Sequence, residues 1–406
     1  MANGNGSGGS GGSGSGGSSQ ATAQQKAAQQ NKQIRQMLLK KAIARMIPLA
    51  AVTLSSGQAA GTTAVNITPQ SVGFLTKFII EITGTANNTD AANTANLSDI
   101  GLANLIAQIQ LVDTQSNTRD QTTGWHLDFL FRAKHRWGAG SALLSSALNE
   151  SGNFGNIFGV TVAPTGFAHG TSQAFRMVFE LPVTYSDTDL RGGIWLGVVN
   201  APAQLNITLT QNPFAASGVD STLSCWKGAA GNISGVTIQV YQCFLDQVPM
   251  NGGAPLLPPL DVSTVYALQN TNNPSTYQAG QDNPLSYANF RRFMSTCYIY
   301  NDNPSADAGR AAGTDINYFA LQSANFTNIW KKFPLQVARE DRVLTLMDFP
   351  PGCYYFSHRK SPINTIAYGN MQLILNPITA DSGAYGLIGW EDFAPLNAIS
   401  QAGSLA

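Results

Sequence analysis

Residues 249–260, PMNGGAPLLPPL, divide this chain into two strand-rich segments that finish with the same short pattern. The upstream segment finishes with FLDQVP at Pro249, and the downstream segment finishes with WEDFAP at Pro395. Each string reads aromatic residue, any residue, Asp, any two residues, Pro. Pro and Gly are concentrated between the segments, which is typical of a connection. We therefore predict two related β domains in tandem, at residues 61–248 and 263–395, joined by a Pro-rich linker at 249–262.

The length and composition support this division. A single hydrophobic core stops growing at about 250–300 residues, and the chain has 406 residues. Its 43% apolar content can fill sizeable cores, whereas its 11% charged content is far below the roughly 25% of an average soluble protein. This low charge indicates that much of the surface contacts other molecules, although strand-rich chains are in general poor in Lys and Glu.

Apolar and polar residues alternate along several segments of both halves. A two-residue period places every second side chain on a buried face and is typical of antiparallel strands. Long Gly, Asn, Ser and Pro-rich loops at 138–164 and 270–284 favour sandwiches with elaborate connections over a meander. We predict an all-β fold of two tandem eight-stranded jelly rolls (a double jelly roll). The positions expected to be buried are Phe175, Met177, Phe179, Leu181, Leu205, Ile207, Leu209, Val236, Ile238, Val240, Met371, Leu373 and Leu375.

The amino-terminal region changes character twice before this pattern begins. Residues 1–20 are almost entirely Gly and Ser, which predicts a flexible arm. From residue 20 to about 47, good helix formers dominate, and Pro48 ends the run. We therefore expect a basic helix and linker at residues 21–60. At the other end of the chain, residues 396–406 are expected to form a tail.

The net charge is zero, but the charges are unevenly distributed. Residues 1–80 contain no acid, while the predicted helix carries six basic side chains, namely Lys26, Lys32, Arg35, Lys40, Lys41 and Arg45. A basic arm on a neutral body suggests attachment to an anionic partner. That partner could be nucleic acid, phospholipid head groups or an acidic patch on a neighbouring subunit.

The spacing of the cysteines does not indicate a metal site, and the amino terminus does not indicate secretion. Cys225, Cys243, Cys297 and Cys353 have no short spacing, so we expect small apolar core residues. No secretory signal is evident, and the longest apolar run, residues 46–54, is too short to cross a bilayer. The expectation is a soluble protein made in a reducing cytoplasm.

Two residues near the middle of the first half invite an enzymatic interpretation. If residues 123–129 form a strand, His126 and Asp128 share one face and could make an imidazole–carboxylate pair. The chain contains four histidines and no nucleophile motif outside the Gly/Ser-rich arm. We therefore interpret His126 as a structural, hydrogen-bonded residue.

Two pairs of acids could suggest hydrolysis or calcium binding. Asp187 with Asp189 lies in a Ser, Thr and Gly-rich segment, which is typical of a side-chain-capped turn. Glu391 with Asp392 would need a partner across a cleft for glycoside hydrolysis. No loop has the EF-hand spacing. We predict no catalytic, cofactor-binding or metal-binding residue.

Several longer strings, in the same order, closely resemble the double jelly-roll major capsid proteins of tectiviruses, which are icosahedral bacteriophages with an internal membrane. The resemblance extends from about residue 67 to residue 393 and does not include the Gly/Ser-rich leader. The strings are TGWHLDF (123–129), YSDTDLRGG (185–193), FLDQVP (244–249), AGTDINYFALQSANFTN (312–328), DFPPGCYY (348–355) and YGNMQLILNPIT (368–379).

The resemblance implies a non-enzymatic coat protein. It implies two jelly rolls per chain and a homotrimer whose six barrels make a nearly hexagonal tile in a shell around the viral membrane. Neighbouring trimers and minor capsid proteins would be its partners, and no direct nucleic-acid binding is expected. The amino-terminal helix would lie on the inner side, near the anionic membrane. The protein would be made in the cytoplasm of a bacterial host and function in the virion.

Two other classes of function share this architecture. One is a tandem jelly-roll hydrolase acting on glycans or glycopeptides, and the other is a receptor-binding lectin of the virion. A hydrolase requires a concave site where carboxylates and aromatic side chains converge. The sequence contains no pattern that predicts such a site.

Overall fold

The computed structural model describes most of the chain outside its first fifteen residues and several loops. The described residues are 16–54, 65–88, 96–97, 101–135, 170, 172–197, 202–209, 225–227, 231–273, 277–302, 315–324, 326–345, 352–381 and 383–396. Most of the predicted arm, nearly all of the predicted tail and the predicted loop at 138–164 therefore lie outside the described residues.

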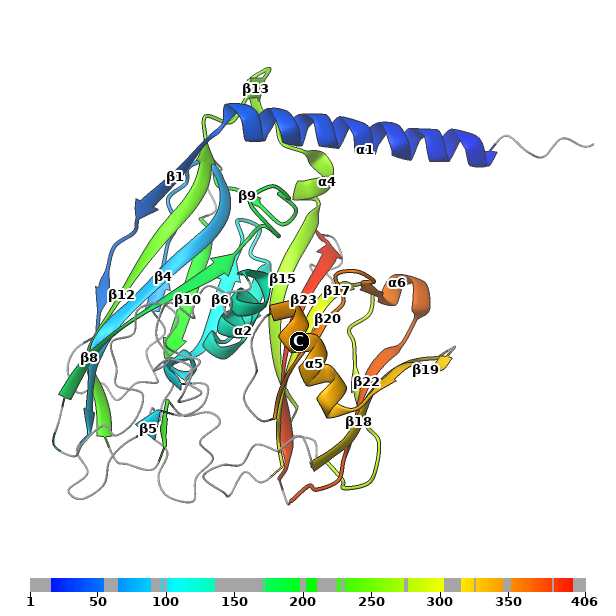
Figure 1. Ribbon diagram of the computed structural model, residues 1–406. Coiled ribbons are helices and arrows are strands. Elements are labelled where there is room, and N and C mark those ends of the chain that lie inside the picture. Colours follow the sequence, from blue (N-terminus) through cyan, green and yellow to red (C-terminus); the bar gives the residue numbers. More distant parts are fainter. Residues whose placement is uncertain are drawn as a thin grey trace, which may run out of the picture.

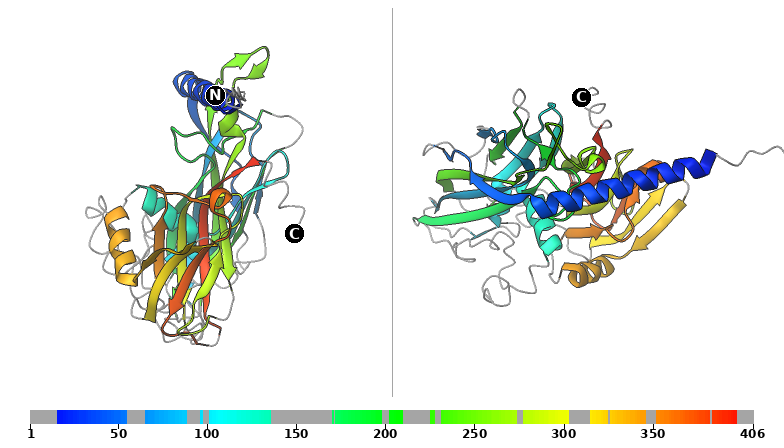
Figure 2. Two further views of the ribbon diagram at one scale, coloured as in Figure 1. Left: turned by 90° about the vertical axis from the view of Figure 1, so that its right-hand side faces the viewer. Right: turned by 90° about the horizontal axis from the view of Figure 1, so that it is seen from above.

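Two barrels lie side by side, and a long helix crosses one end of both (Figures 1 and 2). One six-stranded sheet belongs to the first barrel, one four-stranded sheet belongs to the second, and a nine-stranded sheet lies between them. The strands of the six-stranded sheet are β1 (Ile43–Pro48), β2 (Val52–Thr53), β4 (Phe74–Asn88), β8 (Ser172–Pro182), β9 (Ile194–Trp195) and β12 (Gly231–Asp246).

The other two sheets complete the barrels. The nine-stranded sheet contains β3 (Val65–Ile67), β6 (Ile106–Val112), β7 (Thr118–Thr122), β10 (Gln204–Leu209), β15 (Thr264–Asn273), β17 (Arg292–Asn301), β20 (Cys353–Ser357), β21 (Ile363–Asn364) and β23 (Tyr385–Pro395). The four-stranded sheet contains β16 (Asn283–Ser286), β18 (Ile316–Ser323), β19 (Phe326–Lys332) and β22 (Met371–Pro377).

The remaining elements are short ribbons and helices. Two-stranded ribbons form between β5 (Asn96–Leu97) and β11 (Trp226–Lys227), and between β13 (Met250–Asn251) and β14 (Ala254–Pro255). The helices are α1 (Gly16–Lys41), α2 (Gly124–His135), α4 (Pro259–Val262), α5 (Pro334–Thr345), α6 (Thr365–Tyr368) and the 3₁₀ helix η1 (Gly101–Leu105).

Both barrels have the same strand order. In the first barrel β1-β12-β4-β8 faces β3-β10-β6-β7, and in the second β15-β23-β17-β20 faces β16-β22-β18-β19. If the eight main strands of each barrel are numbered along the chain, both pairs of sheets read 1-8-3-6 and 2-7-4-5. This is the jelly-roll order, in which the first and last strands are neighbours. The predicted double jelly roll is confirmed.

The two barrels share a sheet because β7 and β15 meet in parallel, with Gln121 opposite Gln269. The backbone N–H of Leu268 also donates to Asp120 Oδ1 at 2.8 Å. We call this contact between β7 and β15 the inter-barrel junction. Sequence reasoning anticipated a connection through the linker alone, because pairing between strands so far apart in the chain leaves no local signal.

The predicted alternation of buried side chains is confirmed. The expected apolar positions of β8, β10, β12 and β22 are all buried, as are the four cysteines. Each such strand places one row of side chains in a barrel interior, because successive side chains point to opposite faces of a sheet. In β22 the intervening Ile374 is also buried, and Gln372 is half-buried.

The amino-terminal helix differs from its predicted bounds at both ends. It begins at Gly16, inside the predicted flexible arm, and it ends at Lys41 instead of near residue 47. Residues 43–48 form β1, which pairs antiparallel with β12 from Ile43 opposite Asp246 to Pro48 opposite Tyr241. Tertiary pairing therefore overrides helix propensity here, and Pro48 fits an edge strand, where a missing N–H is tolerated.

The prediction of a strand around His126 is wrong, because residues 124–135 form the helix α2. Residues two apart on a helix do not face each other, so His126 and Asp128 form no pair of the kind considered. The ring of Trp125 instead packs edge-on against Phe129, one turn later, with 5.5 Å between centroids. Helix α2 is only 12 residues long and mostly buried. Periodicity alone does not distinguish a short buried helix of this kind from a strand.

Candidate functional site: the docked amino-terminal helix

Helix α1 packs on the upper end of the first barrel and on the linker (Figures 1 and 2). Its residue Leu38 is fully buried in an apolar cluster with Phe74, Leu190 and Val248. Leu39 and Ala42 of the same region are partly buried against this cluster. The final turns of α1 are therefore held by a small core of their own.

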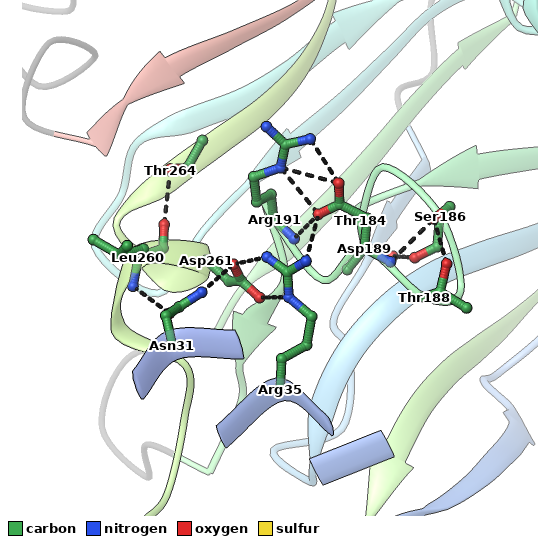
Figure 3. A network of polar contacts seen from close by, with 10 residues as sticks. All are labelled: Asn31, Arg35, Thr184, Ser186, Thr188, Asp189, Arg191, Leu260, Asp261 and Thr264. Atoms are coloured by element: carbon green, nitrogen blue, oxygen red, sulfur yellow. Dashed lines mark hydrogen bonds and ion pairs between the residues drawn. The ribbon is translucent and has the colours of Figure 1, made fainter. Parts of the chain in front are cut away.

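A buried polar contact holds α1 one turn earlier (Figure 3). Asp261, in the short linker helix α4, is fully buried and accepts hydrogen bonds from Arg35 Nε at 2.6 Å and from Arg35 Nη2. Asn31 Nδ2 donates to the same carboxylate at 3.0 Å, while Asn31 Oδ1 accepts from the backbone N–H of Leu260 at 2.8 Å. Two turns of α1 are thus fixed to the linker. The hydrogen bonds to Asp261 raise the pKa of Arg35, although burial acts in the opposite direction.

The turn before β9 supports this contact from the other side. Arg35 Nη1 lies 3.7 Å from Asp189, whose carboxylate also accepts from Arg191 Nη2 at 2.6 Å. Ser186 Oγ accepts the backbone N–H of Asp189 at 3.0 Å, so the predicted side-chain-capped turn is confirmed. Burial would raise the pKa of Asp189, but the hydrogen bonds and charge of Arg191 outweigh it and lower that pKa.

The structure divides the six basic residues predicted as contacts into two groups. Arg35 and Arg45 have partners within their own chain: Arg35 has the contacts above, and Arg45 Nε donates to Asp246 at 2.5 Å in an exposed pair. The four lysines, Lys26, Lys32, Lys40 and Lys41, are exposed on α1. Sequence reasoning missed Asn31 and Asp261, because these residues lie more than 200 positions apart and only the Pro-Pro start of α4 distinguishes Asp261 locally.

The acid pair Glu391 and Asp392 lies in β23, fully buried at the inter-barrel junction. Glu391 accepts from Ser295 Oγ at 2.6 Å and lies 3.0 Å from the Lys134 ammonium of α2. Burial opposes ionisation, yet the charges of Lys134 and Arg359 lower the pKa of Glu391 to about 2. The pair of Glu391 with Lys134 joins the two barrels.

Asp392 has a different environment from its neighbour. Arg291 Nη1 lies 2.9 Å from one of its oxygens and 3.0 Å from the other. Burial nevertheless dominates and raises the pKa of Asp392 to about 6. Both acids form buried ion pairs, Glu391 with Lys134 and Asp392 with Arg291. We therefore interpret them as structural residues.

The described residues offer little for catalysis. Burial lowers the pKa of His126 to about 4, so the ring is neutral, and its Nδ1 lies 2.9 Å from Asn270 Oδ1. A pocket of about 240 Å³ is lined by Glu180 and Asp187, but both carboxylates lie against the Lys77 ammonium, at 3.2 and 3.8 Å. Within the described part of the chain, no three His, Cys, Asp or Glu side chains form a metal-binding group. No helix among these residues is long and apolar enough to span a bilayer.

The fold is that of virus coat structures. The crystal structure of the STIV MCP superposes with a TM-score of 0.62 at 12% identity, covering 87% of this chain and 97% of that chain. A chain in the atomic structure of Sulfolobus Turreted Icosahedral Virus gives a TM-score of 0.57 at 12% identity, covering 88% of this chain and 96% of that one. At these identities the likeness shows the fold alone, and it agrees with the double jelly roll described above.

The sequence comparison identifies the family. Residues 16–248 match the family described as P3 major capsid protein N-terminal, and residues 263–406 match P3 major capsid protein C-terminal. The major capsid protein P3 of Enterobacteria phage PRD1 is 31% identical over 386 residues, covering 93% of this chain and 94% of that protein. The chain belongs to the P3 major capsid protein family, a family of structural and non-enzymatic coat proteins of the tectivirus type.

Proposed function

We propose that three copies of the chain form a ring of six barrels, and that these tiles build an icosahedral shell around an internal viral membrane. The observation that carries this proposal is the double occurrence of one strand order in one chain, with the barrels side by side. A three-fold ring of such chains presents six similar barrels and packs like a six-fold object. Neighbouring trimers and minor capsid proteins would complete the shell.

The trimer is tested by the mass of the purified protein in solution. Light scattering after size exclusion should give three times the chain mass of 43.0 kDa. A stable monomer at micromolar concentration would contradict the proposal. The protein is expected to be made in the bacterial cytoplasm and to function in the virion.

For α1 we propose a position on the inner face of the shell, with Lys26, Lys32, Lys40 and Lys41 toward anionic lipid. These lysines are exposed, whereas the opposite side of the helix is fixed by Asp261. Each cation near an anionic membrane contributes on the order of 1 kcal/mol. One copy would therefore bind weakly, and a lattice of copies would bind strongly.

Flotation with anionic and neutral liposomes tests this orientation. Replacing all four lysines by Gln should abolish binding to anionic vesicles. A control replaces three exposed cations that lie outside α1, β19 and α5, namely Arg176, Arg292 and Lys360, by Gln. Equal flotation of the two variants would remove the proposed role of α1.

A further inference from the structure

The inter-barrel junction shows which elements of one barrel can pack against a second barrel. Strand β7, the fifth main strand of the first barrel, meets β15, the first strand of the second. The segment that enters α2, directly after β7, contacts β15 as well, since Asn270 Nδ2 donates to Thr123 Oγ1 at 3.1 Å and Asn270 Oδ1 lies 2.9 Å from His126 Nδ1. Helix α2 also lies close to β23 of the second barrel. A Cβ atom added to Gly389 of β23 would lie only 2.4 Å from the His126 ring, so no larger residue fits there.

The corresponding edge of the second barrel pairs with no other barrel within the described part of the chain, although α5 itself contacts α2. Strand β19 is the fifth strand of that barrel and forms the edge of its sheet, and α5 follows it as α2 follows β7. Large apolar side chains are exposed there: Leu335 is 82% exposed, Val343 69% and Phe333 62%. In α2, by contrast, Trp125 and Phe129 are buried.

The first strand of the first barrel is also an exposed edge. In the six-stranded sheet β1 pairs with β12 alone, and Met46 is 57% exposed. Figure 1 places β1 and β19 on opposite flanks of the molecule. A head-to-tail contact between copies would therefore bring the β19 edge of one chain to the β1 edge of the next.

The two related strings FLDQVP and WEDFAP give the register of this correspondence. Arg45 lies opposite Phe244, the first residue of one string, and Gln269 lies opposite Trp390, the first residue of the other. Arg45 thus takes the place of Gln269, the residue of β15 that pairs with β7. One position later, Met46 takes the place of Asn270, the residue that contacts the start of α2. In the inter-barrel junction, Asn270 contacts the start of α2. At the equivalent position β1 carries the exposed apolar Met46, and the start of α5, the counterpart of α2, carries the exposed apolar Leu335.

We propose that β19 and the start of α5 in one copy bind β1 of a second copy, with Met46 against Phe333 and Leu335. The contact repeats the inter-barrel junction between chains and replaces its polar contacts by apolar ones. It is a heterologous interface, which generates a closed ring when the rotation closes. This inference rests on the proposed trimer and specifies its interface.

Two single variants test the interface. Met46→Asp and Leu335→Asp should each shift the mass from the trimer to a single chain at micromolar concentration, because a charge would enter an apolar contact. Met250→Asp is the matched control, since Met250 is equally exposed, at 59%, but lies in the β13–β14 ribbon. Circular dichroism should show that all three variants fold.

Cross-linking provides a second measurement. A short bismaleimide should join chains covalently in a Met46→Cys, Leu335→Cys double variant and leave each single variant uncoupled, since all four native cysteines are buried. A trimeric wild type whose mass is unchanged by both Asp variants and whose chains are not joined would overturn the interface but leave the trimer. A monomeric wild type would overturn both.

Discussion

Replacing Asp261 by Asn should loosen α1 from the body of the protein without unfolding the barrels. The buried carboxylate accepts hydrogen bonds from both Arg35 and Asn31. Hydrogen bonds to charged groups contribute about 1.5–3 kcal/mol each, and Arg35 keeps Asp189 as a partner at 3.7 Å. We therefore expect the free energy of detaching α1 to fall by about 1.5–3 kcal/mol, which is a tenfold to hundredfold rise in the opening equilibrium, at 1.4 kcal/mol per factor of ten.

Hydrogen exchange followed by mass spectrometry measures this opening directly. Peptides that cover residues 31–41 should exchange about ten to a hundred times faster in Asp261→Asn, at 1.4 kcal/mol per factor of ten, while those of β12 and β23 keep their protection. Asp246→Asn is the control, because it removes only the exposed pair with Arg45, and such pairs contribute about 1 kcal/mol or less. Unchanged exchange of α1 in Asp261→Asn, or equal effects of both variants, would refute the proposed role of the buried contact.

Three further outcomes follow from the buried groups. Glu391→Gln should lower the free energy of unfolding by about 3–5 kcal/mol in denaturant titrations, because Lys134 and Arg359 lose a buried counter-charge. In the wild type this contribution of Glu391, whose pKa is lowered to about 2, should be present above about pH 4.3 and lost as the pH falls toward 2. Burial raises the pKa of Asp120 to about 7. The contribution of its protonated form to the free energy of unfolding is therefore present below about pH 4 and lost as the pH rises to 7. Asp120→Asn should be more stable than the wild type at pH 7 and equal to it near pH 4. All four cysteines are buried, so a thiol reagent should react with none of them until the chain unfolds.

Much of the fold was predictable because strand signals are local. The alternation from Phe175 to Leu181 specifies which face of β8 is buried without reference to any other strand. The related strings ending at Pro249 and Pro395 revealed the internal repeat, since both occupy the same place at the end of the last strand of a barrel. The parallel contact of β7 with β15 could not be predicted, because it depends on how two finished barrels pack.

The amino-terminal site was only partly predictable. The charge pattern located six basic residues, but it could not separate exposed lysines from Arg35, whose role depends on Asp261, 226 positions away. Residues 43–47 have the composition of the preceding helix, and only the free edge of β12 makes them a strand. In each case a distant partner, absent from any local window, decides the outcome.

Images of the purified protein by electron cryomicroscopy test the central claim most directly. Averages viewed along the barrels should show a three-fold particle with six barrels in a ring, in which the junctions between chains resemble the junctions within them. A particle with two barrels, or a ring whose chains meet at edges other than β1 and β19, would contradict this account.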